Sequence, residues 1–361
     1  MGRLSTGWGA GGAAVVHRGV AGRAGAVTLE DMPPQPSRPA ALARQVFRGS
    51  EAVRLGLLSR HQLRGASWLR LRHDVYADAR LRRDHGLACR AAALRLPPEA
   101  VLAGPSAAYL HGVEHAASFT DDVHVLVPRS ARIDSQPGIR VHTLGAAPVL
   151  LPAGGGPVTR TDDDRAVAAE ATAGPAIVDG TAAGARVLRW STPAQAAWET
   201  AVWLEPFRAV AIVDGLLGRG LVTPADLTAV AERNADRPGG RRARWVFGLA
   251  DGGAQSPPES HLRVRLVLAG LPRPVTQHPI RLASGLALHP DLAWPAFRVA
   301  VEYDGHWHAD AEQLHRDRQR LNHLVGAGWV VLHVTSRRLH RDFPGVAREV
   351  RAALVACGWR R

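Results

Sequence analysis

Helical and strand periodicities alternate most clearly in the last third of the chain. Apolar residues three to four apart predict helices, and short apolar runs bounded by Pro or Gly predict strands. In chain order the pattern predicts a helix over 259–269, a strand near 275–280, a strand on each side of Pro295, a helix over 310–326, a strand over 329–334 and a helix over 346–355. The order α-β-β-β-α-β-α predicts a mixed sheet with helices on both faces, an α/β domain over residues 251–361.

Between residues 41 and 80 the pattern is shorter and basic. Ser59 with Gln62 three residues later is the signature of a capping box, so a helix is expected to begin there. A second short helix is expected near Trp68, followed by a β-hairpin edge from Leu71 to Tyr76. Helix, turn, helix and wing form a winged helix-turn-helix, with three arginines on its recognition helix and wing: Arg64, Arg70 and Arg72. The alternative is a three-helix cap whose arginines are solvated.

Residues 81–250 predict a middle region in which helices and short strands alternate. The strands are expected at 123–127 and 139–142, and the helices at 86–96, 106–111, 193–204, 207–217, 224–232 and 245–250. Residues 251–258 have the Gly, Ser and Pro content of a linker. Residues 1–40 are expected to be a disordered or spurious extension. The fold class expected for the whole chain is α+β.

The composition of the chain predicts an anionic binding partner. The 361 residues carry a formal net charge of +13, which favours nucleic acid first and a membrane surface second. The chain has no lysine, so all 45 basic residues are arginine, and part of the charge reflects a compositional bias. Two distant cysteines and the lack of a long apolar run or signal peptide predict a reduced, cytoplasmic protein outside the membrane.

Three carboxylates are expected to converge on the two strands that flank Pro295. Glu302 and Asp304 are two residues apart on one strand and therefore face the same side. Asp291 opens the preceding strand, and the turn at Pro295 predicts a hairpin between the two. Carboxylates repel one another, so such a cluster costs free energy unless a cation, a shared proton or a hydrogen-bond donor offsets it. A metal site is the first interpretation.

These elements and residues resemble the PD-(D/E)XK nuclease superfamily, near its very-short-patch-repair endonucleases. The motifs that carry the resemblance are Glu259, Pro290-Asp291, Arg298-Val-Ala-Val-Glu302-Tyr-Asp304-Gly, His306-Trp-His308, Arg316-Asp-Arg318 and Gly328-Trp329. More broadly, residues from about 45 to 361 resemble an actinobacterial-type protein whose winged-helix front is similar to that of abortive-infection antitoxins. Arg60–Asp78 and Ser106–Gly112 carry that second resemblance.

The resemblance implies a DNA-binding protein with an endonuclease-like domain that hydrolyses phosphodiesters. Asp291 and Glu302 would ligate Mg²⁺ or Mn²⁺, with Glu259 in support. Arginines of the helix after this cluster would neutralise phosphate: Arg316, Arg318 and Arg320. A toxin or another protein is a second implied partner.

One position departs from the superfamily pattern. Lysine normally follows the second carboxylate by two residues, and Asp304 stands there. His306 or His308 would then supply the base or donor, as histidines do in the very-short-patch-repair branch, or Asp304 would add a third metal ligand. A zinc site that joins these histidines to His315 and a carboxylate is a further alternative. The same departure also fits a non-catalytic, antitoxin-like regulator, and a purely structural interaction module is the remaining possibility.

Overall fold

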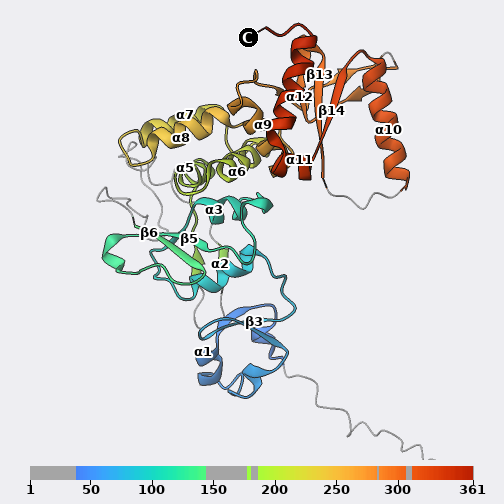
Figure 1. Ribbon diagram of the computed structural model, residues 1–361. Helices are drawn as coiled ribbons and strands as arrows, with labels where there is room; N and C mark the ends of the chain where they lie inside the picture. Colours follow the sequence, from blue (N-terminus) through green and yellow to red (C-terminus); the bar gives the residue numbers. More distant parts are fainter. Residues whose placement is uncertain (1–37, 144–176, 180–185, 283, 306–310, 361) are drawn as a thin grey trace, which may run out of the picture. The chain divides into compact units, whose positions relative to one another are not determined.

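The structure, a computed structural model, describes residues 38–143, 177–179, 186–282, 284–305 and 311–360 (Figure 1). From Arg38 onward the chain forms one compact unit. Its class is α+β, as the pattern predicts, with several small sheets and many helices. The expected extension at 1–40 lies almost wholly outside the described ranges. Among the helices of those ranges, none has the length and apolarity needed to cross a membrane.

The front region is a three-stranded antiparallel sheet with short helical turns. It comprises η1 (Ala40–Leu42), β1 (Val46–Arg48), α1 (Gly49–Arg54), η2 (Gln62–Arg64), β2 (Trp68–Arg72) and β3 (Val75–Asp78), in the strand order β1-β3-β2. The rings of Phe47 and Trp68 meet edge to face in its core, with their centroids 5.2 Å apart. This aromatic contact joins the first strand to the hairpin.

The helices predicted here need correction. Ser59 and Gln62 form the reciprocal capping-box bonds, Ser59 N to Gln62 Oε1 at 2.7 Å and Gln62 N to Ser59 Oγ at 3.1 Å. They begin only the single 3₁₀ turn η2, not an α-helix. Trp68 begins strand β2 instead of a second helix, because its indole is buried against Phe47 in the sheet. The hairpin from Leu71 to Tyr76 is confirmed by the pairing of β2 with β3.

The middle region joins a small sheet to a group of helices. The sheet has the order β4 (Val101–Leu102), β5 (Val123–Val127) and β6 (Ile139–Thr143), and β5 runs antiparallel to β4 and parallel to β6. The other elements are α2 (His85–Ala93), α3 (Gly104–Leu110), η3 (Glu114–Ala116), η4 (Arg129–Ala131), β7 (Ile177–Asp179) and β8 (Arg186–Leu188). Both strands predicted near 123–127 and 139–142 are confirmed.

The helices that follow share one hydrophobic core. They are α5 (Pro193–Trp203), α6 (Pro206–Gly218), α7 (Pro224–Arg233) and α8 (Gly240–Leu249). Each of the first three has Pro at its start, and Thr223 closes a full capping box before α7. The predictions for α5, α6 and α7 are confirmed. The helix predicted at 245–250 begins earlier, because Gly239 takes a left-handed conformation (φ 92°) that starts α8 at Gly240.

The last region contains the predicted mixed sheet. Its elements are α9 (Pro257–Leu268), β9 (Val275–Thr276), β10 (Ile280–Arg281), β11 (Ala287–Leu288), β12 (Leu292–Trp294), η5 (Pro295–Phe297), β13 (Val299–Asp304), α10 (Ala311–Gly326), β14 (Val330–Thr335), α11 (Ser336–Arg341) and α12 (Phe343–Ala356). The sheet order is β14-β13-β12-β9. The strand β13 is antiparallel to β12 and parallel to β14. α11 is a short helix that the pattern did not predict.

Alternation along the strands separates two faces of this sheet. Leu292 and Val301, which pair across β12 and β13, point into the core formed with α9 and α12. The intervening positions point to the opposite face, where Leu324 of α10 packs near Val331 of β14. Figure 1 shows α10 and α12 on opposite sides of the strands. Glu302 and Asp304 of β13 and His333 of β14 therefore lie on the α10 side.

Candidate functional site

Asp291 and Glu302 lie opposite each other on neighbouring strands. Leu292 pairs with Val301, so the next positions outward along the antiparallel ladder are Asp291 and Glu302. Opposite residues of such a pair project from the same face. Because Leu292 and Val301 point into the core, both carboxylates point to the α10 side. The structure thus brings together the pair expected to bind metal.

Asp291 is held on both sides by its neighbours in the sheet. Its Oδ2 accepts a hydrogen bond from the backbone N–H of Tyr303 at 2.8 Å, and its Oδ1 accepts one from Nε2 of Gln277 at 3.1 Å. The backbone N–H of Gln277 also donates to the carbonyl oxygen of Asp291. These bonds fix the direction of the Asp291 carboxylate. A carboxylate held in one direction in this way is prepared to coordinate a metal ion.

Arg320 reaches Glu302 from α10. Its Nη2 lies 3.1 Å from Oε1 of Glu302 and also donates to the carbonyl oxygen of His289. The Glu302 side chain is 15% exposed and that of Arg320 40% exposed. A cation supplied by the chain therefore already stands beside the carboxylate pair.

Burial changes the acidity of both carboxyl groups. Desolvation raises the pKa of Asp291 and the pKa of Glu302 above their ordinary values. Arg320 opposes the rise in both, whereas the negative charge of Asp291 adds to the rise at Glu302. The pair is therefore only partly neutralised, and a bound cation would relieve the remaining repulsion.

Glu259 belongs to the same electrostatic cluster. It lies in the first turn of α9, where its Oε1 accepts from Oγ of Ser256 at 2.7 Å and its Oε2 from the N–H of Gln255 at 2.8 Å. Burial raises its pKa, and the charge of Asp291 contributes to that rise. The supporting role expected for Glu259 is compatible with this placement.

Asp304 contacts a histidine, and its charge also raises the pKa of Asp291. Its side chain is half exposed, and its Oδ2 lies 3.1 Å from Nδ1 of His333 on β14. His333 is the strand neighbour of Glu302 in the parallel pair. An acid and an imidazole are thus in contact at this end of β13 and β14, and His333 is a site histidine that was not in the predicted set.

The other predicted site residues are not described in this detail. His306 and His308 lie outside the described residues. Arg316 and Arg318 are part of α10, and their side chains lie outside the described part, as does that of His315. The zinc site that would use these histidines therefore stays a prediction from the sequence.

The carboxylate pair has the ligand chemistry of a magnesium or manganese site. Among the described residues, no group of three or more His, Cys, Asp or Glu side chains is arranged to hold a metal. Mg²⁺ commonly needs less, since it is bound through one or two carboxylates together with waters and substrate phosphates. Asp291 and Glu302 fit that mode of binding, whereas a closed, all-protein site is not formed by the residues described.

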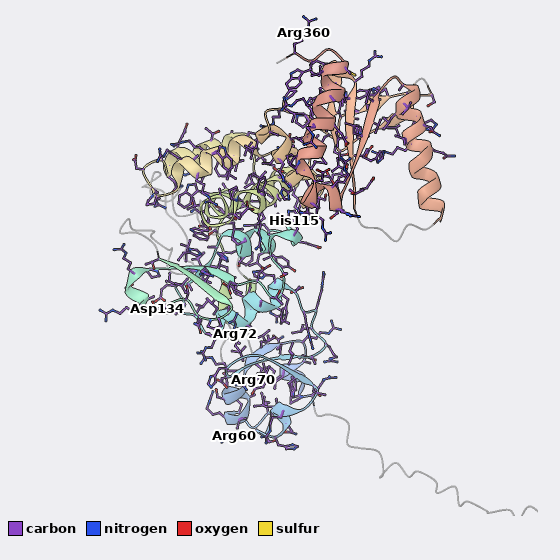
Figure 2. All side chains as sticks on the ribbon, in the orientation of Figure 1. Arg60, Arg70, Arg72, His115, Asp134 and Arg360 are labelled. Atoms are coloured by element: carbon purple, nitrogen blue, oxygen red, sulfur yellow. The ribbon has the colours of Figure 1, made fainter. Side chains whose placement is uncertain are left out.

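The front arginines differ in what they contact. Arg64 ends the turn η2 and Arg70 lies on β2, and both are exposed. Arg72, also on β2, donates from Nη1 to the carbonyl of Pro137 at 2.9 Å and from Nη2 to that of Gly138 at 2.8 Å. Figure 2 labels Arg70 and Arg72 on the front region. None of the three lies on a recognition helix, because that helix is absent from the described front region.

Gln277 and His333 were not among the predicted site residues. Both reach the site only through strand register: Gln277 from the edge of the sheet beside Asp291, and His333 from the strand beside Glu302. A Gln after a two-residue strand and a His inside an apolar strand are weak signals alone. They become visible once the neighbouring strands are aligned.

Comparisons with known proteins found relatives in one organism. The chain is 35% identical over 185 residues to "Uncharacterized protein Rv2248" of Mycobacterium tuberculosis (strain ATCC 25618 / H37Rv), covering 48% of this chain and 68% of that protein. The same values hold for "Uncharacterized protein MT2308" of Mycobacterium tuberculosis (strain CDC 1551 / Oshkosh). No family model matches the chain, and no solved structure does. The chain belongs to the family of these two mycobacterial proteins.

Proposed function

We propose that this protein binds DNA and that its last region hydrolyses phosphodiesters as a metal-dependent endonuclease-like domain. The observation that carries the proposal is the pair Asp291 and Glu302, opposed on one face of a mixed sheet and both partly buried. Burying two adjacent carboxylates destabilises a fold, and a cation that binds between them would offset their repulsion. The arrangement is therefore typical of a metal-binding site. Glu259 at the start of α9 supports the same site.

The residues divide the chemistry among them. Asp291, fixed by Tyr303 and Gln277, and Glu302 would hold a Mg²⁺ or Mn²⁺ ion. When bound, the ion supplies a water of lowered pKa and neutralises charge on the scissile phosphate. Arg320 keeps a positive charge at the pair, and its guanidinium suits phosphate oxygens. The contact of His333 with Asp304 offers an imidazole for proton transfer at the position where the resemblance implies lysine.

The front region would bind the DNA. Its strand order is β1-β3-β2, and α1 and η2 lie between β1 and β2 in the chain. This arrangement is compatible with a winged helix whose recognition element is reduced to one turn. Arg60, Arg64 and Arg70 are exposed around that turn and hairpin. This is the part of the chain that resembles antitoxin fronts.

Cleavage of plasmid DNA tests the enzymatic proposal. The wild type should nick or cut in Mg²⁺ or Mn²⁺ and not in a chelator, and Asp291→Asn and Glu302→Gln should each lower the rate by at least about 100-fold. Glu232→Gln, an exposed change on α7, is the matched control and should leave the rate unchanged. Equal cutting by all four proteins would point to a contaminating nuclease and refute the proposal.

Asp304 favours a second candidate function. An acid in contact with His333 stands where the resemblance implies lysine, so the domain would serve as a non-catalytic part of an antitoxin-like regulator. A toxin or another protein would then be the partner. Binding of promoter DNA with no metal-dependent cutting at any tested metal would select this candidate over the first.

A further inference from the structure

One face of α8 presents arginines around an uncovered tryptophan. The inner side of this helix is buried in the helical core through Ala243, Val246 and Leu249. Its outer side exposes Arg241, Arg244, Trp245 and Gly248. These positions are three and four residues apart, so they form one stripe along the helix. Figure 1 shows α8 beside α7 in the yellow part of the chain.

The arginines of this stripe are not used for internal structure. Arg242, one position away, donates from Nε to the carbonyl of Ala201 at 3.1 Å and so fastens α8 to α5. Elsewhere an exposed arginine can have an acidic partner, as Arg140 has Asp122 at 3.1 Å. No acidic side chain of the described residues lies within ion-pair distance of Arg241 or Arg244. Their charge is left to solvent or to a partner.

The other members of the stripe leave room for close approach. Trp245 is 43% exposed although it carries the largest apolar surface of any residue type. Nothing lies within 4 Å of the place where a Cβ of Gly248 would stand. Arg273 donates to the carbonyl of Gly248 at 2.7 Å, and its charge is partly offset by Asp251 at 3.9 Å, so the free charge of the stripe comes from Arg241 and Arg244. Tryptophan and arginine together are the residues most enriched at binding hot spots.

We propose that this stripe, Arg241, Arg244, Trp245 and Gly248, binds the sugar-phosphate backbone of duplex DNA. Charge complementarity identifies the partner, since planar guanidinium groups match phosphate oxygens and the indole can pack on deoxyribose. Arg241 and Arg244 are about 4.5 Å apart along the helix axis. Both long side chains start within one turn of α8 and can therefore reach neighbouring phosphates of one strand.

Other anionic partners fit the stripe less well. An anionic membrane would require a broad apolar face, and Trp245 is the one large apolar residue on this stripe. An acidic protein would offer separate carboxylates, whereas a DNA strand offers one phosphate per nucleotide in an unbroken row to both arginines. The inference rests on the proposed function in one respect, namely that DNA is the partner. It adds a third contact region, separate from the front arginines and from the carboxylate pair.

Salt-dependent binding of a labelled duplex by the full-length protein tests this assignment. In Arg241→Gln/Arg244→Gln, the negative slope of log affinity against log salt should become shallower by about 1 to 2, because each lost phosphate contact removes about 0.9 from its magnitude. Arg129→Gln/Arg348→Gln removes the same charge from exposed positions elsewhere and should leave the slope unchanged. Trp245→Ala should weaken binding several-fold at an unchanged slope. Thermal unfolding of each variant shows that folding is retained.

The outcomes separate this inference from the proposed function. If the wild type binds DNA and the α8 variants behave like the Arg129/Arg348 control, the α8 stripe is not a DNA site. A larger loss for single-stranded DNA or for anionic phosphatidylserine vesicles than for the duplex would also overturn it. If the variants lose duplex binding but no protein cuts DNA, the nuclease proposal fails and the stripe stands.

Discussion

Arg263 of α9 and Asp214 of α6 form a fully buried ion pair. Arg263 Nη2 donates to Asp214 Oδ2 at 2.6 Å, and both side chains are 1% exposed. Oγ of Ser260 donates to the same Oδ2, and the N–H of Asp251 donates to Oδ1. The helix that carries Glu259 is thereby anchored to the helical group that precedes the mixed sheet.

Removing one member of this pair should be strongly destabilising. Asp214→Ala leaves the Arg263 guanidinium buried without its counter-ion, which typically costs about 3–5 kcal/mol of unfolding free energy. Urea denaturation measures the loss. The double variant Asp214→Leu/Arg263→Met removes both charges and should be less destabilised than the sum of the single variants; strict additivity would show that the two side chains are not coupled.

Glu199 should make the stability of the fold depend on pH. Its carboxylate is buried and accepts hydrogen bonds from Gly104 N–H, Ser191 Oγ and Gln195 Nε2. Desolvation nevertheless raises its pKa to about 7 from an ordinary value of 4.5. Because the folded protein holds this proton more tightly than the unfolded chain, the unfolding free energy should fall as pH rises through that interval.

The Glu199→Gln variant isolates this contribution. The wild type should lose up to about 3 kcal/mol relative to the variant between about pH 4.5 and 7, at about 1.4 kcal/mol for each pKa unit. Denaturation of both proteins across the interval gives the difference. Parallel pH profiles would show that Glu199 ionises normally in the folded protein.

Metal should stabilise the fold through the carboxylate pair. A ligand that binds only the folded protein adds about 2.7 kcal/mol at a hundredfold excess over its Kd. Mn²⁺ should therefore raise the Tm of the wild type and of Glu232→Gln, but not that of Glu302→Gln. The rise should shrink on acidification, because burial raises the pKa of Asp291 and the pKa of Glu302 and protons then compete with metal. An equal rise in the Glu302 variant would place the metal elsewhere.

Arg70 and Arg72 should have opposite phenotypes although they are two residues apart. Arg72→Gln loses the bonds to the carbonyls of Pro137 and Gly138 and should cost about 1–2 kcal/mol of unfolding free energy. Arg70→Gln should leave stability within about 0.5 kcal/mol and weaken DNA binding, since its side chain is exposed. Denaturation and duplex titration of each variant check both statements. Weaker DNA binding in Arg72→Gln alone would reverse the assignment.

Periodicity predicted the central hairpin of the mixed sheet, but the strand expected near 275–280 is divided into β9, which joins that sheet, and β10, which pairs with β11 outside it. The strands around Pro295 carry strong β-prone runs between Pro and Gly, and the structure has β12 and β13 there as a hairpin. The prediction of a helix at Trp68 was wrong because a short run of apolar and basic residues has no clear period. Its burial against Phe47, a residue some twenty positions earlier, decides that it is a strand.

The sequence predicted the site residues that lie within one strand or hairpin, but not the contacts that come from distant strands. Asp291, Glu302 and Asp304 follow from the alternation of one hairpin, but the direction of Asp304 does not. The Asp304 carboxylate contacts His333, and that neighbour comes from a strand beyond α10. Contacts of this kind depend on register between distant strands, which local pattern does not encode.

The alternation that places Asp291 and Glu302 on the α10 side also limits how this region can vary in length. Deleting one residue between Val299 and Val301 would turn Glu302 into the core made with α9 and α12 and push an apolar side chain to the surface. Two changes in length, each harmful alone, would have to arise together to restore the face. Insertions and deletions in members of the family are therefore expected to collect in the loops of this sheet and to spare β12 and β13.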